Sequence, residues 1–157
     1  KAVVMTIEEL YMREHGAWEC KQNSPHHIYT VGEHTEEVVR YCIAHQASED
    51  VIKAAWLHDA GKLYVKIADG RGDHFPQHPE VSAQIAEELG ESLYVVDLVR
   101  YHDAALGWSG TSVKELVKHG RQWCDDLVLL MTADLSGQKQ RMDFAEKLYK
   151  ELGKQNL

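Results

Sequence analysis

Apolar residues recur at helical spacing along the whole chain, and no run of alternating apolar and polar residues is long enough to predict a sheet. Periodicity and capping residues predict helices over about residues 6–15, 31–46, 48–59, 79–90, 92–102, 123–135 and 139–152, and one more that Ser112 opens. The predicted fold class is therefore all-α, a compact bundle of about seven or eight helices.

Three segments between the predicted helices are interpreted as loops: residues 16–30, 63–77 and 103–111. Gly70, Gly72 and Pro76 punctuate the second of them. Binding residues concentrate on loops that a rigid scaffold positions. We therefore expect these three segments to determine which substrate the protein takes.

Length and composition suit one domain, residues 1–157, because 44% hydrophobic content in 157 residues is enough for one core. No repeat, low-complexity tract or linker argues for a second domain. Lys and Arg number 17 against 25 Asp and Glu, a formal net charge of −8, which argues against binding to duplex nucleic acid. An acidic protein still binds a small phosphorylated compound where metal ions supply the positive charge.

Nothing in the sequence predicts contact with a membrane. The longest aliphatic run, residues 127–131, is far shorter than the roughly 20 residues that span a bilayer, and no charged-then-apolar leader is visible. Cys20, Cys42 and Cys124 lack the paired spacing of zinc or redox motifs, so we expect reduced, mostly buried thiols. These features predict a cytoplasmic protein, whose amphipathic last helix offers a surface for homodimer formation.

The histidines are the residues that indicate a functional site. There are ten in 157 residues, and several lie near predicted helix ends. His58 and Asp59 are adjacent, so both reach one ion only where their helix ends, and Gly61 is expected to end it. Imidazole and carboxylate together suit manganese, iron, cobalt, nickel or zinc, and the lack of nearby cysteine argues against a structural zinc. Asp134 follows an apolar helical stripe, where a buried carboxylate needs a charge partner.

The order of these residues resembles the HD-domain superfamily of metal-dependent phosphohydrolases. Residues 57–62, Leu-His-Asp-Ala-Gly-Lys, carry the histidine-aspartate doublet, with a histidine on the preceding helix and an aspartate on a late one. The resemblance covers about residues 31–137. It implies a metal site formed by His34, His58, Asp59 and Asp134, in a cleft between the second, third, fifth and seventh predicted helices.

A finer resemblance, to the HD region of bacterial tRNA nucleotidyltransferases, lies in residues 74–80, His-Phe-Pro-Gln-His-Pro-Glu, and in residues 101–103, Tyr-His-Asp. Members with such extra histidines hold a second metal, which makes His78 and His102 candidate ligands. Taken alone, His78 also suits an N-cap before Pro79, and His102 a polar residue closing a helix. The signature of the nucleotide-adding domain does not occur, so transfer of nucleotides to tRNA is not implied.

Divalent ions activate water and stabilise charge on a phosphoryl group, and two ions about 3.5–4 Å apart do so for both the attacking and the leaving oxygen. We therefore expect a phosphomonoesterase or phosphodiesterase with one or two divalent ions (Mn, Fe, Ni, Co, Zn or Mg), acting on a nucleotide or nucleotide-like phosphate. Asp59 is expected to bridge two ions or orient the water, and Lys62 to pair with a substrate phosphate.

Two other functions stay open: a nucleotide-sensing module that keeps the metal without turnover, and a di-iron oxygenase. Five further histidines are expected away from the metal: His26 and His27 on an exposed loop, and His15, His45 and His119 at helix ends or on the surface. Residues 71–73, Arg-Gly-Asp, are interpreted as a polar turn.

Overall fold

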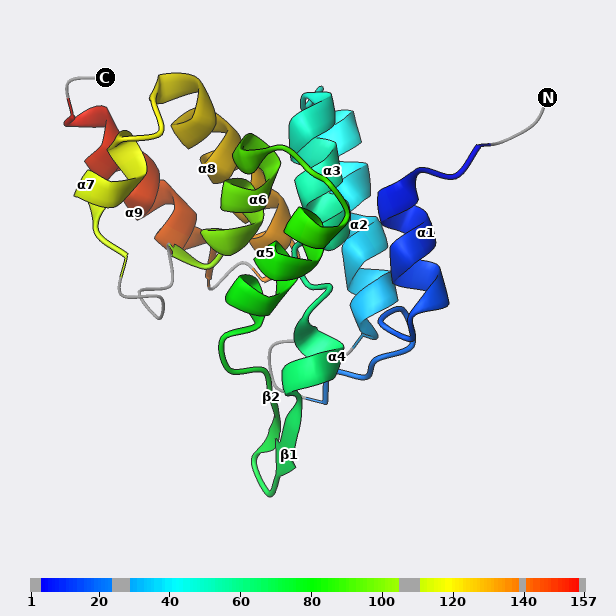
Figure 1. Cartoon of the computed structure of the whole chain (residues 1–157). Helices are drawn as coiled ribbons and strands as arrows, with labels where there is room; N and C mark the ends of the chain where they lie inside the picture. Colours follow the sequence, from blue (N-terminus) through cyan, green and yellow to red (C-terminus); the bar gives the residue numbers. More distant parts are fainter. Residues whose placement is uncertain (1–3, 24–28, 105–110, 139–140, 156–157) are drawn as a thin grey trace.

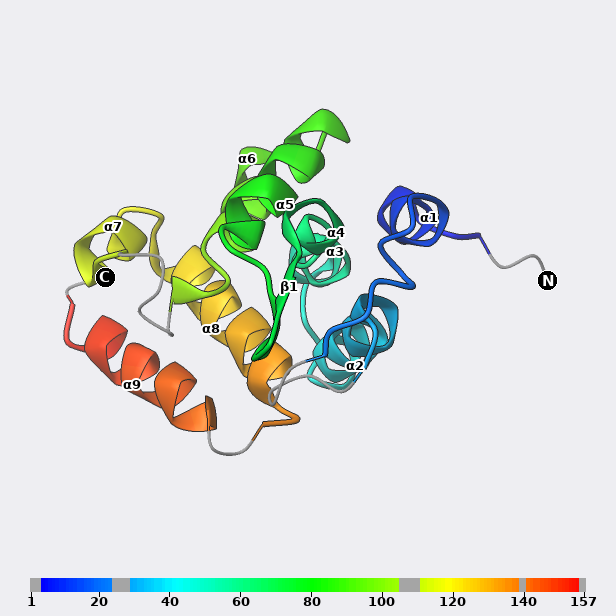
Figure 2. The ribbon, with the colours of Figure 1, turned by 90° about the horizontal axis from the view of Figure 1, so that it is seen from below.

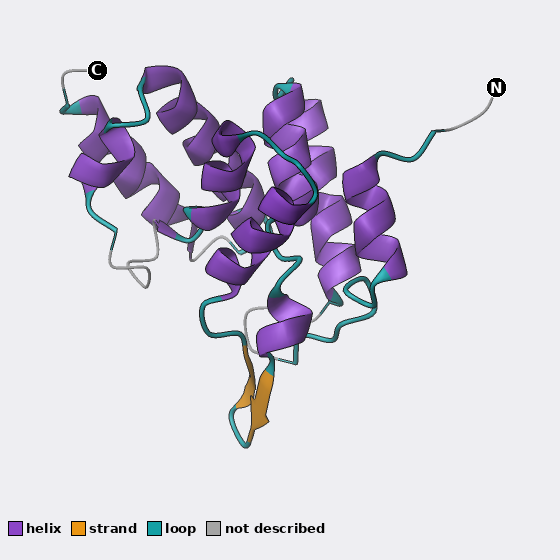
Figure 3. Ribbon diagram, in the orientation of Figure 1, coloured by secondary structure: helices purple, strands orange, loops and turns teal. Residues whose placement is uncertain are grey.

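The computed structural model describes residues 4–23, 29–104, 111–138 and 141–155. Helices dominate these residues, which confirms the all-α prediction (Figure 3). The helices are α1 (Ile7–Glu14), α2 (Val31–Ala44), α3 (Glu49–Leu57), α4 (Lys62–Val65), α5 (His78–Glu88), α6 (Leu93–Arg100), α7 (Val113–Val117), α8 (Arg121–Leu135) and α9 (Met142–Gly153). The strands β1 (Ile67–Asp69) and β2 (Gly72–His74) pair antiparallel. No helix in this described part is long and apolar enough to cross a membrane.

Hydroxyl side chains cap five of the helices in the described part of the chain. Each accepts a hydrogen bond from the backbone N–H three residues further on, as seen at Thr6, Thr30, Ser48, Ser92 and Ser112. The cap at Thr30 is a full capping box, because Glu33 also accepts from the Thr30 N–H. Such a cap contributes about 1 kcal/mol to helix stability, so local sequence alone fixes where these helices start.

The third helix lies at the centre of the bundle and contacts α1, α2, α5, α6 and α8 (Figures 1 and 2). Its apolar side chains Ala54, Ala55 and Leu57 are fully buried. Leu127 and Leu130 on α8 are also fully buried, and burying a leucine contributes roughly 2 kcal/mol. The packed core thus holds rigidly the end of α3, where the His-Asp doublet lies.

Residues 63–77, which the sequence predicted to be an irregular loop, contain most of α4 and the two-stranded hairpin that projects from the bundle (Figure 1). Ala68 pairs with Asp73 in its register. Asp73 is buried, accepts a hydrogen bond from the Asn23 N–H at 2.9 Å and lies 3.3 Å from the Lys66 ammonium. The polar-turn prediction for residues 71–73 is therefore wrong for Asp73, which ties the hairpin to the segment before α2.

The cysteine prediction is confirmed, since Cys20, Cys42 and Cys124 are buried and free. Gly61 differs from expectation. We predicted a flexible helix terminator, but its φ of −80° suits any residue. What requires glycine is space, because a Cβ on Gly61 would lie 2.7 Å from the backbone nitrogen of Ser82. Gly61 thus lets α5 pack directly against the turn that follows the doublet.

Candidate metal centre

The six residues predicted as metal ligands come together in the interior. They arise from five places: α2 supplies one histidine, the α3–α4 turn supplies the doublet, and α5, the residues after α6, and α8 supply the rest. These residues are His34, His58, Asp59, His78, His102 and Asp134. The sequence placed the cleft between the helices that correspond to α2, α3, α6 and α8, and candidate ligands do lie on or next to all four. It omitted α5, whose first residue is His78. His58, Asp59 and His102 are at most 2% exposed.

A first group consists of His34, His58, Asp59 and Asp134. One ligand atom from each lies within 4.8 Å of the others. His58 Nε2 is 3.2 Å from Asp59 Oδ2 and 3.4 Å from Asp134 Oδ1, and His34 Nε2 is 2.7 Å from Asp134 Oδ1. Ligands about 2.0–2.2 Å from one ion lie roughly 3.3 Å from each other, so this spacing fits a single small cation.

A second group uses the other carboxylate oxygen of Asp59. Asp59 Oδ1 lies 3.1 Å from His78 Nε2 and 3.5 Å from His102 Nε2. The two imidazole nitrogens are 3.3 Å apart. Asp59 is therefore placed between two groups of ligand atoms, as a bridging carboxylate would be.

Asp103 is a candidate ligand that the sequence interpretation missed. Its carboxylate oxygens lie 3.5 Å from His102 Nε2 and 3.7 Å from His78 Nε2. Together with His102 and Asp134 it forms a third set of converging ligand atoms. The available signal was its position directly after His102, which makes a second histidine-aspartate doublet in the sequence.

Three imidazoles are oriented by the same local contact. The Nδ1 atoms of His58, His78 and His102 each lie 2.6–3.1 Å from the carbonyl oxygen three residues earlier. Because a carbonyl only accepts, Nδ1 must carry the hydrogen and donate. Nε2 of each ring then faces the carboxylates and is the nitrogen left to bind a metal.

Two buried atoms of the first group have no hydrogen-bond partner: His58 Nε2 and Asp59 Oδ2. They lie 3.2 Å apart, yet not in hydrogen-bond geometry. The Lys62 ammonium lies 3.2 Å from Asp59 Oδ2 and balances its charge, but neither His58 Nε2 nor Asp59 Oδ2 makes a hydrogen bond within the described part of the chain, and buried polar atoms are nearly always paired. The residues present therefore fit a divalent cation with mixed nitrogen and oxygen ligands.

The electrostatics of the centre favour positive charge. Burial alone would raise the pKa of Asp59, but the charges of His58 and Lys62 hold it well below its usual range. Burial likewise opposes the charged form of His58, whereas Asp59 and Asp134 raise its pKa well above the ordinary value. Carboxylates concentrated among imidazoles in a dry interior thus attract cations strongly.

Lys62 lies inside the protein and not on an exposed turn. It is 4% exposed, and its ammonium group donates a 2.5 Å hydrogen bond to Gln22 Oε1. It also lies 3.2 Å from Asp59 Oδ2 and 5.0 Å from the centre of the Phe75 ring. In this arrangement Lys62 holds the doublet carboxylate in place, and Gln22, a second residue that sequence reasoning missed, holds Lys62.

Six histidines are not among the candidate ligands, and one of them, His74 on β2, is exposed and lies 3.0 Å from Asp69. His15 and His45 are exposed at helix ends, as predicted, each with Nδ1 bonded to a carbonyl one turn earlier. His119 is half-buried, lies 3.1 Å from Asp97 and stacks on Trp123 at 3.9 Å, so its surface prediction is only partly correct. The prediction for His26 and His27 lies outside the described residues.

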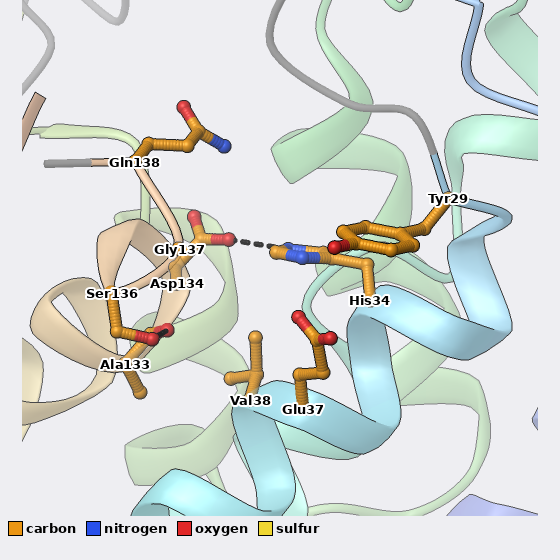
Figure 4. A pocket seen from close by; sticks show the side chains of 9 residues that line it. All are labelled: Tyr29, His34, Glu37, Val38, Ala133, Asp134, Ser136, Gly137 and Gln138. Carbon is orange, nitrogen blue, oxygen red and sulfur yellow. Dashed lines mark hydrogen bonds and ion pairs between the residues drawn. The ribbon is translucent and has the colours of Figure 1, made fainter. Parts of the chain in front are cut away.

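A hollow of about 330 Å³, counted to its open mouth, adjoins the first group of ligands (Figure 4). His34 and Asp134 form part of its wall. The rest of the wall comes from α2 and the residue before its cap, and from the end of α8 and the turn after it: Tyr29, Glu37, Val38, Ala133, Ser136, Gly137 and Gln138. The candidate metal centre is therefore accessible from this side.

Histidine and aspartate side chains from five segments of a helical fold thus converge on one buried centre, an arrangement compatible with divalent metal binding. The model of the HD domain family matches residues 31–149, and this chain belongs to that family. No curated protein matches the chain. Nothing in these comparisons indicates a particular closeness to tRNA nucleotidyltransferases.

Proposed function

We propose that this protein is a metal-dependent phosphohydrolase that cleaves a phosphate ester of a nucleotide or a nucleotide-like compound. One observation carries the proposal: the two oxygens of Asp59 face different groups of imidazoles, His34 and His58 on one side and His78 and His102 on the other. A shared carboxylate between two ligand groups is the arrangement of two-metal hydrolases. Membership of the HD domain family supports the same reaction class.

When bound, divalent cations would polarise a phosphoryl oxygen and lower the pKa of a bound water. His34, His58, Asp59 and Asp134 would hold one ion, and Asp59, His78, His102 and Asp103 a second. Phosphoryl transfer depends mainly on positioning and charge stabilisation, which the locked imidazoles and the Lys62–Asp59 contact provide. The reaction is hydrolysis: water attacks phosphorus, the ester P–O bond breaks, and the alcohol leaves with a proton.

The ligand types also restrict the metal. Four imidazoles favour manganese, iron, cobalt, nickel or zinc over magnesium, which prefers oxygen ligands. Buried Asp59 and the partly buried Asp134 balance the charge of such an ion in the interior. We therefore expect activity with Mn²⁺, Co²⁺ or Ni²⁺ to exceed activity with Mg²⁺.

The test is phosphate release after removal of bound metal and reloading with each ion in turn. The substrates are nucleoside 5′-, 3′- and 2′-monophosphates, 2′,3′-cyclic phosphates, and nucleoside di- and triphosphates. Asp59→Asn should lower turnover at least about 100-fold, whereas Asp125→Asn, on the exposed side of α8, should leave it unchanged.

Three results would contradict the proposal. Release of no phosphate from any substrate with any ion argues against a hydrolase. Tight nucleotide binding without release supports the sensing module instead. Oxygen consumption by the iron-loaded protein supports the oxygenase.

A further inference from the structure

Atoms without a hydrogen-bond partner gather in one place, at and beside the His-Asp doublet. Within the described part of the chain, five buried side-chain atoms have no partner, and three of them belong to His58, Asp59 and Gln22. The Lys62 ammonium joins two of these side chains, because it lies 3.2 Å from Asp59 Oδ2 and 2.5 Å from Gln22 Oε1. Buried polar groups are nearly always paired, so such a concentration of orphaned atoms indicates a ligand.

The amide of Gln22 can be oriented in only one way. The Lys62 ammonium donates hydrogen bonds and cannot accept them, so it must be the oxygen Oε1 that contacts it. This leaves the Nε2 group, with its two N–H donors, on the far side of the amide. Gln22 is 1% exposed, and in the described part of the chain no acceptor meets Nε2. A buried donor in this state is destabilising unless a ligand supplies the acceptor.

The acceptor that Gln22 requires is not the cation itself. His58 Nε2 and Asp59 Oδ2 are atoms that coordinate a metal, whereas an amide nitrogen offers only hydrogens. Gln22 therefore needs an oxygen that carries a free lone pair. A phosphoryl oxygen bound to a cation at the doublet meets this need, since phosphate oxygens are strong acceptors of charge-assisted hydrogen bonds.

Lys62, which we expected to pair with a substrate phosphate, is already surrounded by partners. Its ammonium lies against Gln22 Oε1, Asp59 Oδ2 and the ring of Phe75, whose centre is 5.0 Å away. Its side chain is also almost fully buried. The uncommitted donor beside the doublet is therefore the Gln22 amide, and the Lys62 charge behind it makes the place favourable for an anion.

The backbone on both sides of Gln22 is fastened to the hairpin and to the residue that precedes it. The Asn23 N–H donates to Asp73 Oδ2 at 2.9 Å, and the Asn23 carbonyl accepts from the Asp73 N–H at 2.7 Å. The Lys21 carbonyl accepts from the Lys66 ammonium at 2.9 Å. A donor held in place before its ligand arrives stabilises charge without reorganisation. The hairpin thus fixes the position of Gln22 beside the doublet.

We propose that Gln22 is a phosphate-binding residue, whose Nε2 group donates a hydrogen bond to a phosphoryl oxygen held at the metal centre. This inference rests on the proposed hydrolysis and adds to it a residue that contacts the substrate. Gln22 lies in residues 16–30, one of the segments expected to determine the substrate. Because every phosphate ester carries phosphoryl oxygens, Gln22 strengthens binding of the phosphate and does not select the leaving group.

The first test measures binding of inorganic phosphate to the Zn²⁺-loaded protein by calorimetry. Gln22→Glu keeps an oxygen for Lys62 to donate to, but it replaces the two N–H donors by an oxygen that only accepts. The dissociation constant for phosphate should rise at least about 10-fold, because a hydrogen bond to a charged group is lost. Gln84→Glu, exposed on α5, changes the net charge equally and should bind phosphate as the wild type does.

The second test separates loss of the hydrogen bond from repulsion by the new carboxylate. Zn²⁺ is diamagnetic, so NMR detects the side-chain amides of the ¹⁵N-labelled wild-type protein with the metal bound. The Gln22 amide signal, identified by its absence in Gln22→Glu, should move downfield when phosphate saturates the site. The Gln84 signal should not move. Circular dichroism and zinc content show that each variant is folded and loaded, and uncharged Gln22→Met replaces Gln22→Glu if the latter does not fold.

Phosphate binding in the Gln22 variant with wild-type affinity overturns the inference. So does a Gln22 amide signal that phosphate leaves in place, or a wild-type protein that binds no phosphate. These outcomes are distinct from failure of the proposed function. Binding that depends on Gln22, with no phosphate released from any ester, supports the role of Gln22 and contradicts hydrolysis. Release of phosphate by a protein whose Gln22 variant binds phosphate normally supports hydrolysis and contradicts the role of Gln22.

Discussion

His78 and His102 present their Nε2 atoms to each other at 3.3 Å, while both Nδ1 atoms donate to backbone carbonyls. With both Nδ1 atoms protonated, two neutral rings would point lone pairs at each other, which is unfavourable. A positive charge shared between the rings removes the conflict, and Asp59 Oδ1 lies within 3.5 Å of both nitrogens to balance it. A divalent cation satisfies the same three atoms, so this pair is where a second ion is expected.

Replacing His102 by alanine should lower the metal content from two equivalents to one. The second group loses an imidazole, whereas His34, His58, Asp59 and Asp134 are unchanged. Elemental analysis of the purified variants measures the effect, with His45→Ala as the control because His45 is exposed at the end of α2. A wild-type protein that holds a single equivalent, retained by His102→Ala, would show that His78 and His102 do not bind metal.

Asp103→Asn should weaken binding of the second ion about 10–100-fold without removing the first. The carboxylate lies 3.5 Å from His102 Nε2, so the amide keeps its shape but loses the charge that attracts the ion. Competition with a chelator of known affinity gives the dissociation constant. Asp125→Asn provides the matched control on exposed α8 surface, and equal affinities in both variants would exclude Asp103 from the site.

Most of the fold could be predicted because helical periodicity and hydroxyl caps are local features. Thr6 and Ser48 open helices where the sequence indicates, since each caps a backbone N–H only three residues away. The hairpin at residues 67–74 could not be predicted, because its strands are three residues long and Asp73 is fixed by Asn23, fifty positions earlier. Contacts of that kind leave no periodic pattern in the sequence.

The site, too, could be predicted where it depends on sequence pattern and not where it depends on contacts between distant segments. The six predicted ligands could be named because their order along the chain resembles a known family. Gln22 could not, because its role depends on how the segment before α2 packs against the doublet, and for Asp103 the sequence offers only its position next to His102. Lys62 was noticed, yet its burial against Asp59 is a property of packing that spacing does not reveal.

Gly61→Ala should destabilise the protein by about 2 kcal/mol, as overpacking of a tight contact does. A methyl group there would lie 2.7 Å from the Ser82 backbone nitrogen and 2.9 Å from the Val81 Cβ, so α5 must shift away from the doublet turn. Urea unfolding monitored by circular dichroism measures the change.

Gly70→Ala is the matched control, because a Cβ at Gly70 meets nothing within 4 Å. We expect its stability to stay within about 0.5 kcal/mol of wild type. Equal unfolding midpoints for the two variants would mean that α5 does not depend on close approach at Gly61.

Glu8 on α1 and Glu91 in the turn between α5 and α6 form a carboxyl pair. Glu8 is 3% exposed, and the Oε2 atom of Glu91 is buried without a hydrogen-bond partner. Burial, together with the hydrogen bond and charge of Glu8, raises the pKa of Glu91 to about 7, and Asp50 adds to this while Lys53 opposes it. The folded state therefore keeps a proton that the unfolded chain releases above its ordinary pKa of 4.5.

It follows that this pair favours folding most at low pH. Its contribution declines as pH rises from 4.5 towards about 7 and is constant above that value, because the folded state binds more protons in this window. Glu91→Gln should remove the decline and be more stable than wild type above pH 7, by about 1 kcal/mol because water screens part of the carboxyl. Urea unfolding at a series of pH values tests this against Glu87→Gln, an exposed position on α5. Parallel pH profiles for wild type and Glu91→Gln would show that the two carboxyls do not share a proton.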